Sequence, residues 1–176
     1  PTQSDVEQAL AQTASNFAGR KIEELVDLPE MTEAEPLAAM RILSSAITLA
    51  YQSFPQLMPL ICSKQIGLSI TYGNAPLSAF SYIVYGLILC GIVGDIETGY
   101  KLGELAESLV NKYNLKEVSI KVIGTFNQLI KPWKENTRNT LKPLEDIYYA
   151  ALEVGDLEFG AYALISLSYH NYFAGK

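Results

Sequence analysis

The chain has 176 residues, enough for one domain with a substantial hydrophobic core. Hydrophobic residues make up 49% of it, and this amount of apolar surface excludes a disordered chain. The formal net charge of −6 argues against nucleic acid as a partner, because a phosphate backbone requires a basic face. Two cysteines and one histidine provide neither a disulfide framework nor a usual metal site, so we predict no metal, no cofactor and a cytoplasmic location.

The chain begins Pro1-Thr2-Gln3, without an initiator methionine or a signal-type apolar stretch, and we interpret it as a single fragment of a larger protein. Its most apolar run covers residues 83–93, which is about half the ~20 residues that a membrane span requires. The run also contains two glycines and leads directly into a turn. We therefore predict a buried helix here and no membrane partner.

The predicted elements begin with a leading segment, 1–30, which consists of a helix over residues 4–17 and a packed connector. Turn and cap signals then recur at intervals of 19 to 23 residues, at Thr32, Ser53, Asn74, Asp95, Asn114, Thr137 and Asp156. This spacing indicates one helix and one turn about every twenty residues. No strand pattern competes convincingly, so we predict an all-α fold with about seven or eight helices.

Two of the turns share a sequence pattern. Residues 94–99 read Gly-Asp-Ile-Glu-Thr-Gly, and residues 155–160 read Gly-Asp-Leu-Glu-Phe-Gly. This pattern resembles the inter-helix turn of tetratricopeptide (TPR) repeats, although two helices span about 41 residues here and about 34 in that family. Apolar helices alternate with amphipathic ones, as a solenoid with shielded inner helices requires. We therefore predict a right-handed helix-pair repeat, a TPR-like α-solenoid, over residues 31–176, with three pairs and one unpaired helix.

His170 is the only histidine available for acid–base catalysis. A catalytic histidine needs a nucleophile and an orienting carboxylate, and no motif in the sequence supplies either. We therefore predict a packed, hydrogen-bonded histidine, no catalytic residue and no enzyme activity in this chain. Cys62 and Cys90 are interpreted as small hydrophobic residues, and the Gly99–Gly103 pair as a site of close helix packing.

One cluster has the residue types typical of protein recognition. This basic cluster contains the only tryptophan and consists of Trp133, Lys134, Arg138 and Lys142. In one interpretation, which we favour, Trp133 fills a gap at an inter-helix turn and the cations lie near helix ends. In the other, the cluster contacts a partner. Both place Trp133 at a helix end with Lys134 exposed beside it.

The last predicted helix has two apolar sides. Phe159, Ala163, Leu167 and His170 lie along one side, and Leu157, Ala161, Leu164 and Ser168 lie along another. Only one side can pack on the preceding helices, so the other is expected to remain open. An open apolar side favours association, and we predict a homodimer formed through this C-terminal helix.

Three stretches of the sequence carry a resemblance that covers nearly the whole chain: residues 28–32 (LPEMT), 72–91 and 132–176. They resemble the helical region of large bacterial signalling proteins, especially cyanobacterial ones. Those proteins join a serine/threonine protein kinase domain, an AAA-type ATPase, this helical region, a GAF domain and often a sensor histidine kinase. The resemblance implies a non-catalytic regulatory or scaffolding module that contacts other domains of the same protein or a signalling partner.

Two other functions stay open at this level. The 11 tyrosines and 6 phenylalanines are compatible with a small-molecule sensor that has an apolar pocket between helices. An enzyme built around His170 is the least favoured of the three hypotheses.

Overall fold

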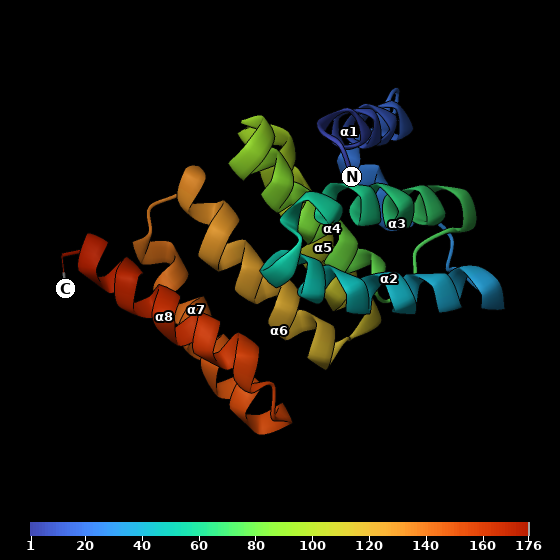
Figure 1. The fold of residues 1–176 in the computed structure, drawn as a ribbon. Coiled ribbons are helices and arrows are strands. Elements are labelled where there is room, and N and C mark those ends of the chain that lie inside the picture. Colours follow the sequence, from blue (N-terminus) through green and yellow to red (C-terminus); the bar gives the residue numbers. More distant parts are fainter. Residues whose placement is uncertain (176) are drawn as a thin grey trace.

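The computed structural model describes residues 1–175, and Lys176, the last residue of the predicted repeat region, lies outside the described residues. Within residues 1–175 the structure is all-helical and has no strand, which confirms the predicted all-α class (Figure 1), while the TPR-like solenoid arrangement stays a prediction. Its eight α-helices are α1 (Gln3–Phe17), α2 (Ala34–Ser53), α3 (Met58–Tyr72), α4 (Ser78–Ile88), α5 (Ile96–Tyr113), α6 (Lys116–Thr125), α7 (Arg138–Val154) and α8 (Leu157–Phe173). Short 3₁₀ or π segments join them: η1 (Ile22–Asp27), η2 (Pro55–Leu57), η3 (Leu89–Val93), η4 (Phe126–Ile130) and η5 (Lys131–Trp133).

The predicted helix starts agree best with the structure where an acidic or threonine cap follows a turn. Helices α5, α7 and α8 begin directly after Asp95, Thr137 and Asp156. Asn114 behaves differently, because it ends α5 in the left-handed conformation, with φ 50°, and α6 begins after Leu115. Asparagine adopts this conformation more readily than most residues, which explains why Asn114 ends a helix instead of beginning one.

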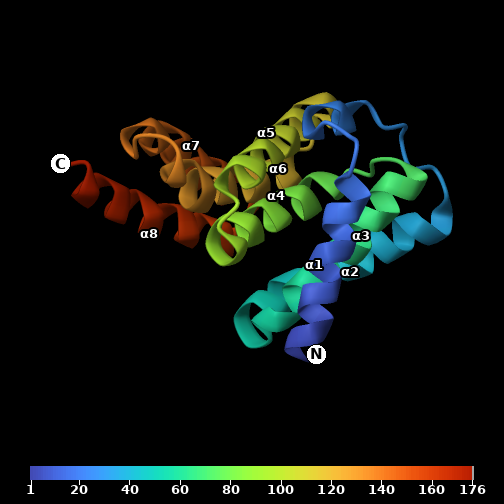
Figure 2. The same ribbon diagram turned by 90° about the horizontal axis from the view of Figure 1, so that it is seen from above.

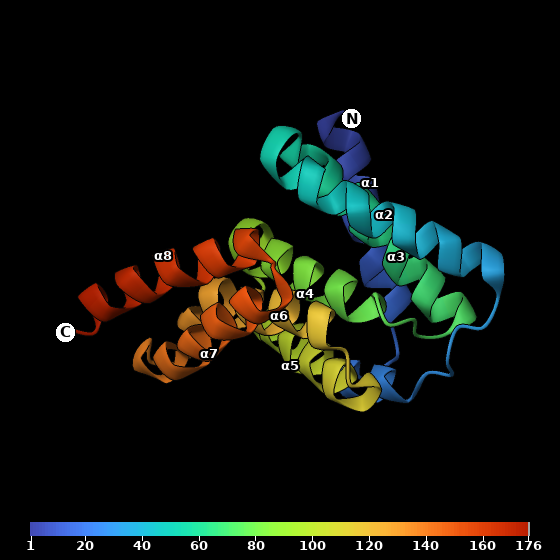
Figure 3. The ribbon, with the colours of Figure 1, turned by 90° about the horizontal axis from the view of Figure 1, so that it is seen from below.

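Helix α4 lies in the middle of the molecule, packed against α3, α5 and α6 (Figure 1). At one end of the molecule α1 and α2 pack on α3, and at the other α7 and α8 form a hairpin beside α6 (Figure 3). Seen from above, α1, α2 and α3 project away from the layer that α4 to α8 form (Figure 2). This arrangement brings α2 and α8, which are far apart in the sequence, to the same side of α4.

Glycines allow α4 and α5 to cross closely. A Cβ atom on Gly99 would lie 2.7 Å from the carbonyl oxygen of Gly86 and 2.5 Å from the Sγ of Cys90. One turn later, a Cβ atom on Gly103 would overlap the ring of Phe126. The close packing predicted for the Gly99–Gly103 pair is therefore confirmed. Cys90 is a buried, free thiol at this crossing, and Cys62 is likewise buried and free in α3.

A buried asparagine fastens the leading segment to the rest of the molecule. The Asn74 side chain donates to the carbonyl oxygen of Leu25 at 2.7 Å and accepts from the Tyr82 hydroxyl at 3.2 Å. Its backbone donates to Pro29 at 2.7 Å and accepts from Met31 at 2.9 Å. Every polar group of this residue is thus paired, as full burial of an amide requires.

The close crossing of α4 and α5 predicts opposite effects for two glycine substitutions. In Gly99→Ala the methyl group would meet backbone atoms, and we expect the free energy of unfolding to fall by about 1–3 kcal/mol. Gly91→Ala is the control, because a Cβ atom there meets nothing within 4 Å. Alanine should raise stability at that position by up to about 1 kcal/mol. Urea denaturation of both variants checks this, and equal effects would contradict the close crossing.

Candidate functional site

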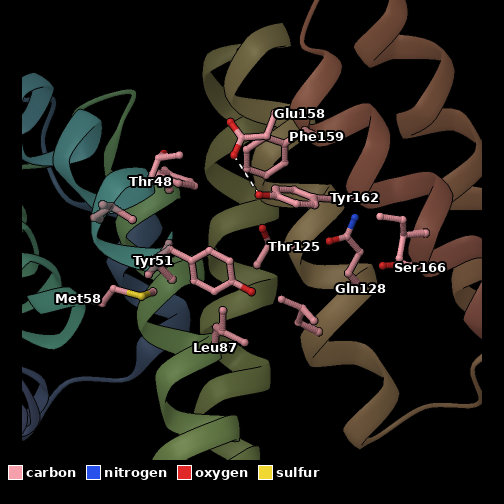
Figure 4. Close-up of a pocket in the computed structure, with 15 residues that line it drawn as sticks. Thr48, Tyr51, Met58, Leu87, Thr125, Gln128, Glu158, Phe159, Tyr162 and Ser166 are labelled. Carbon is pink, nitrogen blue, oxygen red and sulfur yellow. Dashed lines mark hydrogen bonds between the residues drawn. The ribbon is translucent and has the colours of Figure 1, made fainter. Parts of the chain in front are cut away.

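An apolar pocket of about 200 Å³ lies between α2, α4, α8 and the segment formed by α6 and η4 (Figure 4). We call it the interhelical pocket. Its floor is made of buried side chains, which include Ile47, Phe80, Val84 and Phe159. Its rim is made of exposed side chains, which include Tyr51, Leu129, Glu158 and Ile165.

The helical periodicity of the sequence explains which residues reach this pocket. On α4, Phe80, Val84 and Leu87 follow one another at four- and three-residue steps and therefore share one face. On α8, Ile165 and Ser166 follow Tyr162 by three and four residues, so these side chains also share one face. The pocket is thus the place where faces of three separate helices meet without filling the space between them.

A polar bridge crosses the pocket between α2 and α8. The Gln52 side-chain amide donates to Glu158 Oε1 at 2.9 Å, and the Tyr162 hydroxyl donates to the same oxygen at 3.0 Å. Burial and the neighbouring Glu158 carboxylate raise the pKa of Tyr162, so this phenol stays protonated. Figure 4 shows the Tyr162–Glu158 pair at one side of the pocket. Of the pocket-lining residues, all of which lie in the described part of the chain, only Glu158 carries a charge.

Gln128 brings a polar group to the opposite side of the pocket. Its side chain is 9% exposed, and the Nε2 atom has no hydrogen-bond partner. Gln128 lies in η4, a π-helical turn, and such turns are frequent at functional sites. A buried amide nitrogen without a partner is destabilising, and this atom has less than 1 Å² of accessible surface, so it is not open to the pocket.

His170 lies behind the pocket and holds α7, η4 and α8 together. Its ring is 8% exposed, and Nδ1 is 2.6 Å from the Thr140 hydroxyl. Burial lowers the pKa of His170, and the backbone carbonyl of Gln128 opposes this effect. The predicted packed and hydrogen-bonded histidine is confirmed. The Thr140 hydroxyl that it contacts is fully buried, so this pair offers no accessible nucleophile.

Because the pKa of His170 in the folded chain is below its ordinary value of about 6.5, the unfolded chain binds the proton more strongly. The neutral His170 ring therefore stabilises the folded chain above about pH 6.5. This stabilisation is lost as the pH falls toward the pKa that His170 has in the folded chain. We expect the free energy of unfolding to decrease as the pH falls below about 6.5. His170→Gln should remove this dependence. Urea titrations across the range measure it, and identical pH profiles for the two proteins would contradict the assignment.

The structure places the basic cluster along η5 and the first turns of α7. Trp133 ends η5 with Lys134 exposed beside it, as predicted. The favoured interpretation of Trp133 as a core plug is wrong, because 54% of its surface is exposed. The short η5 turn ends the preceding helical run before Trp133 can turn back toward the core.

The three cations of the basic cluster each bind within the chain. Lys134 pairs with Glu97 at 2.6 Å, and Arg138 donates to the carbonyl oxygen of Ala174 at 2.9 Å. Lys142 pairs with Glu145 and Asp146 on its own helix. These contacts orient the cations, and a contact between the cluster and a partner stays a prediction.

The exposure of Trp133 predicts a small effect on stability. In Trp133→Ala we expect the free energy of unfolding to change by about 1 kcal/mol or less. Phe126→Ala is the matched control, since that ring is fully buried, and it should cost about 3–5 kcal/mol. Thermal or urea unfolding compares the two variants, and a large loss in Trp133→Ala would restore the core-plug interpretation.

Helix α8 has one packed side and one open side, as predicted. Phe159, Ala163 and His170 are buried and Leu167 is half-buried, whereas Leu157, Ala161, Leu164 and Ser168 are exposed. The open side also carries large aromatic residues that the sequence analysis did not single out. We call the exposed apolar residues of this helix the α8 stripe: Leu157, Leu164, Ile165, Tyr169, Tyr172 and Phe173.

Within residues 1–175, no group of three or more His, Cys, Asp or Glu residues is arranged to hold a metal ion. No helix in that part of the chain has the length and hydropathy needed to cross a membrane. Comparisons with protein-family models, with curated proteins and with solved structures find no match. The function must therefore be argued from the interhelical pocket and from the exposed surfaces.

None of the residues that line the interhelical pocket was predicted from the sequence to bind a ligand. An apolar pocket between helices was predicted only as an alternative. A signal was present at Asn127 and Gln128, two polar residues that interrupt the apolar run between Phe126 and Ile130. Helical periodicity alone does not show that the gap between α2 and α8 stays unfilled.

Proposed function

We propose that this chain is a non-catalytic, TPR-like helical-repeat module of a bacterial serine/threonine kinase–ATPase signalling protein. In this role it mediates regulatory or scaffolding contacts in the cytoplasm, with other domains of the same protein or with a partner. The resemblance of residues 28–32, 72–91 and 132–176 to the helical region of such proteins supports the setting. The main support for the contact function is the exposure of the apolar residues that form the α8 stripe.

Two turns with the same geometry support the repeat. Gly94 and Gly155 both end a helix in the left-handed conformation, with φ 84° and 78°. The aspartate after each glycine then caps the next helix, at 3.1 Å from Asp95 Oδ1 to the Thr98 nitrogen and 3.2 Å from Asp156 Oδ1 to the Phe159 nitrogen.

The same turns also fix how each helix packs on the one before it. Gly99 faces Cys90, and Gly160 faces Ala151, in each case nine residues earlier in the chain. The α4–α5 and α7–α8 hairpins are therefore built by one local rule, and α6 packs between them.

The α8 stripe has the composition of a contact surface. It exposes three aromatic rings, and Tyr172 and Phe173 are 77% and 73% exposed. Aromatic residues are enriched at protein interfaces, and adjacent exposed apolar residues of this size favour association. We propose a second copy of the chain as the occupant, with the two α8 helices paired about a two-fold axis.

Sedimentation velocity at micromolar concentration tests this contact. We expect a dimer for the unmodified chain and a monomer for the Leu157→Lys/Tyr169→Lys variant, because two charges on the α8 stripe would have to be desolvated in the dimer. Ile42→Lys/Leu49→Lys on α2 is the control, with residues about 70% exposed, and it should remain dimeric. A monomeric unmodified chain, or a dimer that only the α2 variant disrupts, would contradict the proposal.

We propose a small-molecule sensor as the second candidate function. The interhelical pocket supports it, since ligand sites are typically concave, mostly apolar and provided with a few polar groups. This function does not exclude the first, because a sensor can also act through its surface.

A further inference from the structure

We infer that the interhelical pocket binds a small organic cation, with an apolar body of about one ring and a protonated primary amine, and that the Glu158 carboxylate holds the ammonium group. The inference rests on the sensor function proposed above and names the chemistry of its ligand. It follows from how burial, charge and aromatic rings are distributed along the lining of the pocket.

The lining changes from apolar at the floor to charged at the rim. Ile47, Phe80 and Val84 are buried and offer only hydrocarbon or aromatic surface to a ligand. Among the lining residues, all of which lie within residues 1–175, only Glu158 is charged, and it is exposed at the rim. A molecule with an apolar body and one charged end matches this gradient, because the body leaves water while the charged end stays partly hydrated and avoids the full cost of burial.

The sign of the charge at the rim selects a cation. Glu158 attracts an ammonium group and repels a carboxylate, and the net charge of −6 acts in the same direction at longer range. None of the ion pairs within residues 1–175 involves Glu158. Arg41 and Lys121 line the adjoining hollow and not the pocket, and the Lys121 Nζ atom lies 5.4 Å from the Phe159 ring centroid. The described part of the chain therefore leaves the Glu158 carboxylate without a counter-ion.

The Glu158 carboxylate is already held in position. The Gln52 side-chain amide and the Tyr162 hydroxyl both donate to Oε1, and Figure 4 shows the bond from Tyr162 at one side of the pocket. Because both bonds are made to Oε1, Oε2 remains for a donor on the ligand. A primary ammonium group has three donors, and a hydrogen bond between charged groups is stronger than one between neutral groups. A carboxylate that is fixed beforehand also loses little further side-chain entropy when the ligand binds.

Four aromatic side chains suit both parts of such a ligand. Phe80 and Phe159 form part of the floor, and Tyr51 and Tyr162 extend into the space between the helices (Figure 4). Phe159 and Tyr162 meet edge to face, with ring centroids 5.7 Å apart, and a ligand ring beside them would make further contacts of this kind. The face of a tyrosine ring also attracts an ammonium group that lies within about 6 Å of its centroid.

The volume of the pocket limits the apolar body to about one ring. A dry cavity of about 150 Å³ accommodates benzene, and the interhelical pocket has about 200 Å³. The additional space suits a chain of two or three heavy atoms, which would carry the ammonium group from the floor to the rim. A nucleotide or a lipid chain is much larger than this.

Phenethylamine is the probe for this chemistry, because two carbon atoms join its ring to a primary amine. Its neutral match is 2-phenylethanol, and its anionic match is 3-phenylpropionate. The amine is protonated at pH 7, as is the lysine side chain, whose ordinary pKa is about 10.4. In NMR titrations of the isotope-labelled whole chain at low salt, the amine should bind about fivefold tighter than the alcohol, and the carboxylate should bind more weakly than either. Added salt should reduce the advantage of the amine and leave binding of the alcohol unchanged.

Two substitutions that remove the same charge test the role of Glu158. Glu158→Gln retains an oxygen that can accept from Gln52 and Tyr162 but has no charge, and the amine and the alcohol should then bind within about twofold of each other. Glu153→Gln on α7 is the matched control, because Glu153 is exposed and does not line the pocket, and the fivefold preference should persist.

Two further substitutions on α8 identify the site. Ser166→Phe places a ring in the pocket and should abolish binding of the amine, whereas Ser168→Phe adds the same ring on the exposed side and should preserve it. Circular dichroism and the midpoint of thermal unfolding verify that each variant is folded.

The possible results separate the ligand chemistry from the sensor function. If Ser166→Phe abolishes binding but the amine and the alcohol bind the unmodified chain equally, a pocket ligand remains and the inferred chemistry is overturned. Equal losses of the preference in Glu158→Gln and Glu153→Gln would also overturn it, because they indicate a general attraction of cations to an acidic chain. If none of the three compounds at millimolar concentration shifts the resonances of pocket residues or raises the unfolding midpoint, the inference and the sensor function both fail. The contact function of the α8 stripe is unaffected by that outcome.

Discussion

The need to cover α4 on every side determines how the other helices are arranged. No residue from Ala75 to Gly94 is charged, and a helix that is apolar all round is stable only when neighbours surround it. Helices α3, α5 and α6 provide most of this cover. The glycines at the α4–α5 crossing bring α5 close enough for backbone atoms to touch, so this side of α4 is sealed completely.

The interhelical pocket lies where the cover of α4 is least complete. Phe80, Val84 and Leu87 face the space between α2 and α8, two helices that are joined there by the polar bridge from Gln52 to Glu158. The pocket therefore results from the same requirement that forms the core, namely that the apolar helix α4 is covered on every side. The polar residues that line it, Thr125, Gln128 and Ser166, distinguish it from a packing defect lined only by apolar groups.

The sequence predicted those features that depend on local patterns. The turns at residues 94–99 and 155–160, the aspartate caps within them and the two sides of α8 follow from residue type and helical spacing. Features that depend on how distant helices meet were missed. The core-plug interpretation of Trp133 failed because its exposure is decided by the η5 turn. The orphaned amide of Gln128 depends on a π turn and on the separation of α2 from α8.

Helix α8 connects the two proposed functions physically. Ile165 lines the interhelical pocket and also belongs to the α8 stripe, and Gln52 ties α2 to α8 across the pocket. A ligand between α2 and α8 and a partner on the outer side of α8 would therefore act on the same element. When two ligands bias one element, each changes the affinity of the other by the same factor. Under both proposals the dimer affinity and the pocket affinity are thus linked quantities, and the sign of the linkage depends on whether the dimer favours the open or the closed spacing of α2 and α8.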